Sequence, residues 1–102
     1  MKLLAVTACA SGVAHTFMAA ESLEKAAKER GHEVKVETQG LSGIENKITN
    51  DDIKNADAVI LTKDMPIRER ERFEGMKIFN VTVKAAIKDA VKIMEAVESH
   101  CK

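Results

Sequence analysis

Cys9 stands at the head of a run of mostly small residues that could hold a phosphate group and react with it. The run Cys9-Ala10-Ser11-Gly12-Val13-Ala14-His15-Thr16 follows an apolar segment and leads into a helical pattern. A strand–loop–helix connection collects backbone N–H groups and the positive end of the helix dipole, which favour anions. The same field favours a thiolate, so Cys9 is a candidate nucleophile. A small buried apolar cysteine is the alternative interpretation.

Three polar residues of this run have candidate roles around a bound anion. Ser11 and Thr16 would add hydroxyl donors, and His15 would bind the loop or add positive charge. An ordinary turn or helix-cap residue is the alternative interpretation of each, and the pattern by itself favours it. The glycine-rich nucleotide and dinucleotide motifs are absent from the sequence, so a nucleotide site is not expected.

The residue six positions after Cys9 separates two kinds of phosphate chemistry. Cysteine-dependent phosphatases have arginine at that spacing, where it stabilises the transition state of attack by water. Here the residue is His15, and the loop contains no arginine. This favours holding and passing on a phosphoryl group over hydrolysing it. A low-molecular-weight cysteine phosphatase or arsenate reductase stays an alternative, with Asp64 as its general acid; a plain turn is the other interpretation of Asp64.

Hydrophobic periodicity predicts the elements that position Cys9. Strands are expected at 2–7, 33–38, 57–62 and 76–81, and helices at 16–30, from Thr49 to near Asn55, at 67–73 and from Thr82 to the end. Strands that alternate with helices predict an α/β fold, a three-layer sandwich with a parallel sheet and helices on both faces. The first helix should bury Ala19, Ala20, Leu23, Ala26 and Ala27, and the last Val83, Ala86, Ile87, Ala90, Val91, Met94 and Val97.

Strand polarity predicts the order of the sheet. The first and third strands are apolar throughout and should be central, whereas the second and fourth should be edges. In the second strand Val34 and Val36 should face inward, and Lys35 and Glu37 outward. With right-handed crossovers the four-stranded parallel sheet has the order 2-1-3-4, whose winding reverses between strands 1 and 3. Ligands bind at such a point beyond the carboxyl ends of the strands, and Cys9 lies there.

Bulk composition restricts the class of protein. The 102 residues, 45% of them hydrophobic, predict one domain spanning 1–102. Sixteen basic and sixteen acidic residues argue against a nucleic-acid partner. No apolar run approaches the ~18–20 residues of a membrane span, so direct insertion is not expected. The two cysteines show no zinc-site spacing, and neither a metal nor a cofactor is predicted. A cytoplasmic protein with reduced thiols is expected.

At these residues the chain resembles the fructose-type enzyme IIB domain of the bacterial phosphoenolpyruvate-dependent sugar phosphotransferase system (PTS). The matching stretches are Thr7-Ala8-Cys9, Gly12, Ala14-His15-Thr16-Phe17-Met18-Ala19-Ala20-Glu21, Val36-Glu37-Thr38-Gln39-Gly40, Ile44-Glu45-Asn46, Ala56-Asp57, Asp64 and Arg72-Phe73. One departure is Ala10-Ser11, where the family usually has Pro-Thr. Proline would fix φ and stiffen the loop.

The resemblance implies a phosphocarrier function for a single IIB domain. The cysteine of such a domain accepts a phosphoryl group from a phosphohistidine on a IIA partner and gives it to fructose or a related sugar bound by a membrane IIC partner. Cys9 would then be the phosphocysteine. Its cradle would be Ala10, Ser11, Gly12, Val13, Ala14, His15 and Thr16, and its partner contacts would be Thr38, Gln39, Gly40 and Asp64. A non-catalytic regulatory module that keeps the fold is the other alternative.

Two further expectations concern the surroundings of this domain. The resemblance implies a cytoplasmic protein that associates with a membrane transporter, and Met1 with a completed last helix favours a free-standing subunit. The charged run from Arg68 to Arg72 is typical of a solvated face, with docking of a partner as the alternative.

Overall fold

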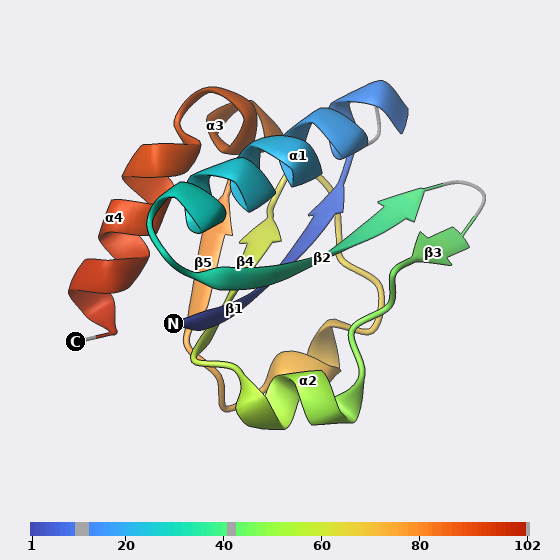
Figure 1. Cartoon of the computed structure of the whole chain (residues 1–102). Helices are drawn as coiled ribbons and strands as arrows, with labels where there is room; N and C mark the ends of the chain where they lie inside the picture. The colour runs from blue at the N-terminus through green and yellow to red at the C-terminus, as the bar shows by residue number, and fades with distance from the viewer. Residues whose placement is uncertain (10–12, 41–42, 102) are drawn as a thin grey trace.

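The structure is a computed structural model that describes residues 1–9, 13–40 and 43–101. Its elements follow one another as strands, helices and one short 3-10 helix, η1 (Figure 1). They are β1 (Lys2–Ala8), α1 (Val13–Glu29), β2 (Glu33–Gly40), β3 (Gly43–Glu45), α2 (Asn50–Asn55), β4 (Ala58–Thr62), η1 (Arg70–Phe73), β5 (Ile78–Val81), α3 (Val83–Lys88) and α4 (Ala90–His100).

The strands form one mixed sheet in the order β3-β2-β1-β4-β5. The strands β2, β1, β4 and β5 are parallel, in the order predicted for the four expected strands, and β1 and β4 are central as predicted. The prediction of four strands is wrong, because β3 pairs antiparallel with the outer side of β2. Only two residues separate β2 from β3, which suits an antiparallel neighbour; a parallel one needs a long crossover.

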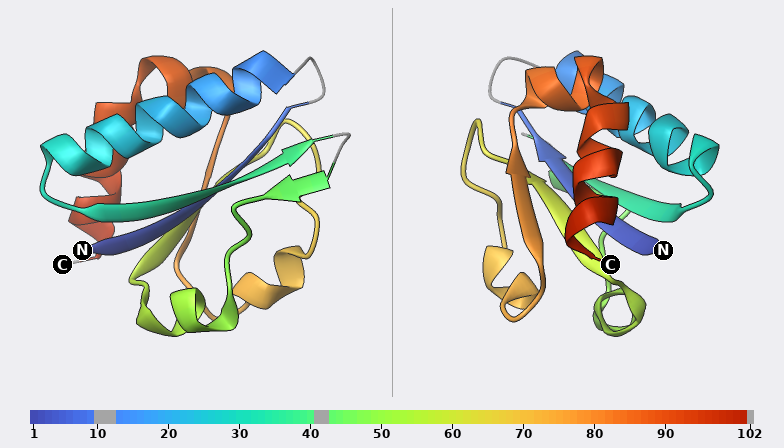
Figure 2. Two further views of the ribbon diagram at one scale, coloured as in Figure 1. Left: turned by 45° about the vertical axis from the view of Figure 1, so that its right-hand side comes forward. Right: turned by 90° about the vertical axis from the view of Figure 1, so that its left-hand side faces the viewer.

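Helices cover both faces of the sheet, as predicted. α1, α3 and α4 lie on one face, and α2 and η1 lie on the other (Figures 1 and 2). Alternate residues of β1 supply the two cores, with Leu3 and Ala5 facing α1 and Leu4 and Val6 facing the opposite layer. The first core is rich in alanine, which lets α1 pack closely on the strands. All five predicted inward positions of α1 are buried.

Three of the predicted helices differ from those in the structure. The helix expected at 67–73 is only the short 3-10 helix η1, which begins at Arg70. α1 begins at Val13, three residues before the predicted start. The last helix is interrupted at Asp89, which has φ −121° and ψ 31°, so α3 and α4 are separate helices. Val91 was predicted to be buried and is 45% exposed, whereas Ile93 takes an inward position. α2 begins as predicted at Thr49, whose side chain and that of Asp52 form a capping box.

None of the helices in the described ranges combines the length and the apolar character that a membrane span requires.

Candidate active site around Cys9

Cys9 lies directly after the central strand β1, at the carboxyl edge of the parallel sheet. Side chains of a strand alternate between faces, so Cys9 is on the same side as Leu3, Ala5 and Thr7, the side covered by α1 and α3. The cysteine is half-buried and packs against the core on that side. Its position is the one that strand order predicted, beside the point where the winding reverses.

A hollow of about 380 Å³ opens beside Cys9. Its walls come from α1, from the segment after β4 and from α3. The lining residues are Cys9, His15, Met18, Asp64, Val83, Lys84, Ile87 and Lys88. Lys84 and Lys88 are exposed and belong to one face of α3, four positions apart. They bring two positive charges to the hollow, against the single carboxylate of Asp64.

These two lysines were missed in the sequence because they are distant in the chain from Cys9. A signal was nevertheless present: Lys84 and Lys88 have the i, i+4 spacing of one helix face, in the helix that follows the strand next to β4. Their place beside Cys9 depends on how α3 packs against α1, which periodicity does not reveal.

Asp64 fixes the beginning of α3 next to this hollow. Its Oδ1 accepts the N–H of Val83 at 2.7 Å, and the hydroxyl of Thr82 accepts the N–H of Ala85 at 3.0 Å. Two of the N–H groups that a helix start leaves without intrahelical partners are thereby satisfied. Asp64 therefore has a structural role in holding α3, and with it Lys84, beside Cys9.

The predicted cradle residues fall into two groups. Ala10, Ser11 and Gly12 lie outside the described residues. Val13, Ala14 and His15 were predicted to lie in the loop and instead form the first turn of α1 together with Thr16, which was predicted to be helical. That placement was wrong because the positions that show the helical period, beginning with Ala19 and Ala20, lie further along the chain. His15 is exposed and lines the hollow with Cys9, whereas Thr16 is buried at 4% exposure.

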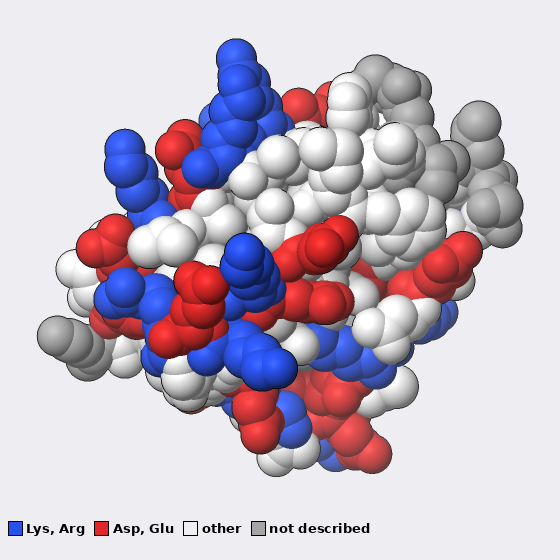
Figure 3. Space-filling model, turned by 45° about the horizontal axis from the view of Figure 1, so that its top comes forward, with Lys and Arg blue, Asp and Glu red and all other residues white. Residues whose placement is uncertain are grey.

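The outer surface of this region is largely uncharged. Figure 3 shows the face formed by α1 and α3, where a broad uncharged area is bordered by both basic and acidic side chains. Phe17 and Met18 in α1 are 45% and 49% exposed, among the few large apolar side chains left in solvent. Met18 also lines the hollow.

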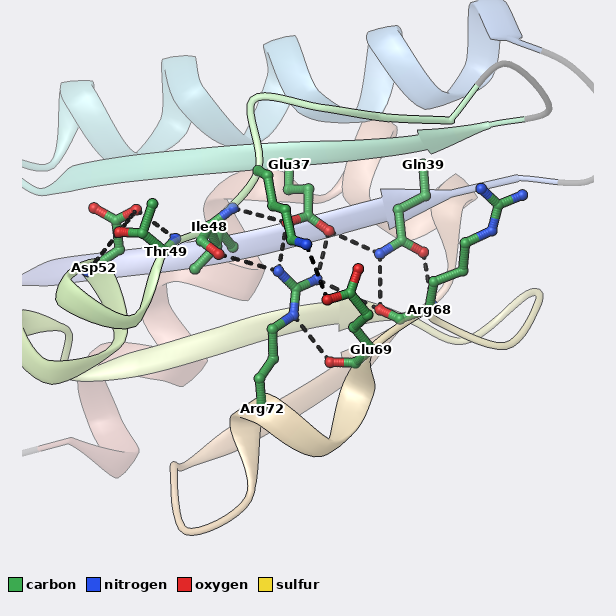
Figure 4. A network of polar contacts seen from close by, with 9 residues as sticks. Glu37, Gln39, Ile48, Thr49, Asp52, Arg68, Glu69 and Arg72 are labelled. Carbon is green, nitrogen blue, oxygen red and sulfur yellow. Dashed lines mark hydrogen bonds and ion pairs between the residues drawn. The ribbon is translucent and has the colours of Figure 1, made fainter.

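Three predicted partner contacts lie at the carboxyl end of β2. Thr38 and Gln39 are buried, at 8% and 3% exposure, and Gly40 is half-buried. The amide of Gln39 is engaged inside the chain: it accepts the N–H of Arg68 at 2.8 Å and donates to the Arg68 carbonyl at 3.1 Å and to Glu37 at 2.8 Å (Figure 4). Contact of this segment with a partner stays a prediction, and the Gln39 side chain has a structural role.

The carboxylate of Glu37 is the centre of this network. Glu37 was predicted to face solvent but is fully buried, since the segment after β4 and η1 cover that face of β2. Arg72 binds both of its oxygens, and the N–H of Ile48 binds Oε1 at 2.8 Å (Figure 4). Burial by itself raises the pKa of Glu37, but the hydrogen bonds from Arg72, Gln39 and Ile48 outweigh it and the pKa is lowered.

The charged run from Arg68 to Arg72 is therefore not uniform. Arg72 is turned inward to Glu37, and Glu69 forms an ion pair of 3.0 Å with Lys47. Arg70 and Glu71 are exposed, as a solvated face would be. The alternating charges of this run gave no indication that Arg72 binds a buried partner, Glu37.

Among the described residues, no group of three or more His, Cys, Asp and Glu side chains is arranged to hold a metal ion. The chemistry available at the hollow is that of a thiol, an imidazole, a carboxylate and two ammonium groups.

Residues 4–96 match the protein family described as "PTS system, Lactose/Cellobiose specific IIB subunit". Curated relatives are named for another sugar. The chain is 58% identical over 99 residues to "PTS system fructose-like EIIB component 2" of Escherichia coli K12, covering 97% of this chain and 93% of the relative.

Solved structures give the same result. A domain of the fructose-specific IIABC component of Borrelia burgdorferi superposes with a TM-score of 0.88 at 47% identity, covering 94% of this chain and 91% of the other. The Enzyme IIB subunit of the PTS of Escherichia coli K12 superposes with a TM-score of 0.90 at 45% identity, covering 97% and 92%.

Proposed function

The chain belongs to the IIB family of the sugar phosphotransferase system, and on that basis we propose that Cys9 is the residue that carries the phosphoryl group. The chain is a fructose-type IIB phosphotransferase component that acts in sugar uptake. The observation that carries the assignment to Cys9 is its placement at the end of the central strand, half-buried and opening on a hollow lined by His15, Lys84 and Lys88.

Two displacements at phosphorus make up the reaction. In the first, the Cys9 thiolate attacks the phosphorus of a phosphohistidine on a IIA protein; the P–S bond forms, the P–N bond breaks, and the histidine nitrogen keeps the electron pair. In the second, a sugar hydroxyl oxygen attacks the same phosphorus, the P–S bond breaks and the thiolate returns, while the hydroxyl proton passes to a base. Neither displacement requires an oxidant, a reductant or a metal held by this chain.

Positive charge around Cys9 suits the transferred group, which carries about two negative charges. Lys84 and Lys88 lie on the wall of the hollow, and the first turn of α1 adds the positive end of its dipole. No arginine lines the hollow in the part of the chain that the structure describes, so the bidentate clamp that aids attack by water is missing there. Transfer between protein and sugar is favoured over hydrolysis.

The partners follow from the two displacements. The donor is a IIA protein with a phosphohistidine, and the acceptor is a sugar of the fructose type, held by a membrane IIC protein. A cytoplasmic chain that associates with that transporter meets both. The fructose-like names of relatives at 58% and 46% identity support this sugar over lactose or cellobiose.

The test is reconstitution with labelled phosphate. Purified IIA protein carrying labelled phosphohistidine should transfer the label to this chain, and membranes containing the IIC protein should then form labelled fructose phosphate. A chain that takes no label from IIA, or that releases inorganic phosphate as fast as it takes label, would overturn the proposal.

A further inference from the structure

Two buried threonine hydroxyls hold the chain on either side of Cys9. We propose that Thr62 and Thr7 are positioning residues, which set the place of the Cys9 sulfur through backbone groups of Ala8 and Thr16. This role rests on the proposed function of Cys9 and extends it to residues that do not touch the phosphoryl group.

Thr62 holds the residue directly before Cys9. Its hydroxyl accepts the N–H of Ala8 at 3.0 Å and donates to the Ala8 carbonyl at 3.3 Å. Backbone pairing between β1 and β4 runs only as far as Val6 and Leu61, so the Thr62 side chain continues the link for β1 beyond that pairing. Thr62 and Ala8 are 2% and 1% exposed, which leaves little access for water to replace these bonds.

Thr7 holds the other side of the same connection. Its hydroxyl, which is fully buried, donates to the carbonyl of Thr16 at 3.1 Å, in the first turn of α1. A carbonyl oxygen has two lone pairs, so this bond adds to the helix pattern without replacing it. The bond joins the end of β1 to the start of α1 and so fixes the span between the two ends of residues 9–15.

Both threonines lie on the side of the sheet that Cys9 faces. Thr7 and Cys9 share a face of β1 by alternation, and Thr62 shares the face of Ala58 and Ile60, which pack against the α1 side. The two hydroxyls restrain the backbone directly before Cys9 and at the start of α1. Displacing a reacting atom by about 1 Å costs on the order of 100-fold in rate.

Paired substitutions separate the hydroxyl from the shape of the side chain. Thr62→Val keeps the branched shape and removes the hydroxyl, whereas Thr62→Ser keeps the hydroxyl and removes a methyl group; Thr7→Val and Thr7→Ser do the same on the other side. All are made with Cys101→Ser, so that Cys9 is the one thiol of the chain. Thermal unfolding of each variant is recorded, and rates are measured at a temperature where all are folded.

The first readout is transfer of phosphate from phosphorylated IIA protein at saturating concentration. We expect Thr62→Val to lower the maximal rate at least about tenfold with little change in KM for the donor, and Thr62→Ser to stay within about threefold of the parent. Equal rates for the valine and serine variants would overturn the positioning role. If Thr62→Val does not fold, the Thr7 pair decides by the same criterion.

The second readout is the rate at which iodoacetamide alkylates Cys9, which needs no partner. The valine variants should change this rate and the serine variants should restore it. A change in alkylation together with phosphorylation at a residue other than Cys9 would refute the proposed function and leave the positioning role standing. Unchanged alkylation and transfer in both valine variants would refute the positioning role alone.

Discussion

Arg72 binds both carboxylate oxygens of the buried Glu37, at 2.8 Å to Oε1 and 2.6 Å to Oε2. The two residues are 35 positions apart, and the pair joins η1 to β2 (Figure 4). The guanidinium also donates to the Ile48 carbonyl at 3.2 Å, so one side chain links three segments.

Removing the arginine should therefore be costly. In Arg72→Met the Glu37 carboxylate stays buried without its counter-charge, and we expect a loss of about 3 kcal/mol in the free energy of unfolding. Arg70→Met is the matched control, since Arg70 is exposed in the same short helix and should change stability by less than about 0.5 kcal/mol. Urea unfolding measures both, and equal losses would contradict the assignment.

Acid should destabilise the protein through two surface carboxylates. Hydrogen bonds from Arg30 and then His32 lower the pKa of Glu98 from 4.5 to about 2. A bond from Lys35, followed by bonds from Thr49, lowers the pKa of Asp52 from 3.8 to about 2. Because these folded-state pKa values are depressed, the contribution is present above the unfolded values and is lost as pH falls toward about 2.

The measurement is the free energy of unfolding between about pH 5 and about pH 2. Glu98→Gln should flatten the fall in stability over that range, because the side chain no longer titrates. Glu21→Gln, at an exposed position of α1, is the control and should follow the parent. A Glu98→Gln variant with the parent's full pH dependence would show that the Arg30–Glu98 pair contributes nothing there.

Reversing charge on α3 should slow phosphoryl transfer from the donor. Lys84→Glu and Lys88→Glu each place a negative charge in the hollow beside Cys9. We expect each substitution to lower kcat/KM for phosphorylated IIA protein about tenfold. Because salt screens charges, this decrease should be smaller at high salt concentration. Lys54→Glu, in α2 on the opposite face of the sheet, should leave the rate near that of the parent. Three equal rates would remove the lysines from the site.

Much of the fold could be predicted because a strand that is buried on both faces is apolar throughout, and this is visible in the sequence. The apolar strands β1 and β4 are central, and the position of Cys9 at the carboxyl edge of the sheet could be predicted from the strand order. Glu37 was mispredicted for a definite reason: alternation shows which residues share a face, but not that Arg72 will cover that face. Strand β3 was missed because Gly43–Glu45 is too short to show the alternation of apolar and polar residues that marks a strand.

The site was predicted in part for a related reason. Cys9 and His15 are local to one connection, so their proximity is visible in the sequence. Lys84 and Lys88 reach the hollow only through the packing of α3 on α1, and Asp64 holds α3 through a backbone N–H that no side-chain pattern reveals. The roles of Ala10, Ser11 and Gly12 stay predictions, since these residues lie outside the described ranges.

The central claim is that Cys9 carries the phosphoryl group. Mass spectrometry of the chain after incubation with phosphorylated IIA protein tests it most directly, with peptides mapped and iodine used to cleave the thiophosphate. The parent and Cys101→Ser should each gain one phosphoryl group on the peptide that contains Cys9, and Cys9→Ser should gain none. A phosphoryl group of equal yield on Cys9→Ser, or mapped to His15 in the parent, would contradict the account.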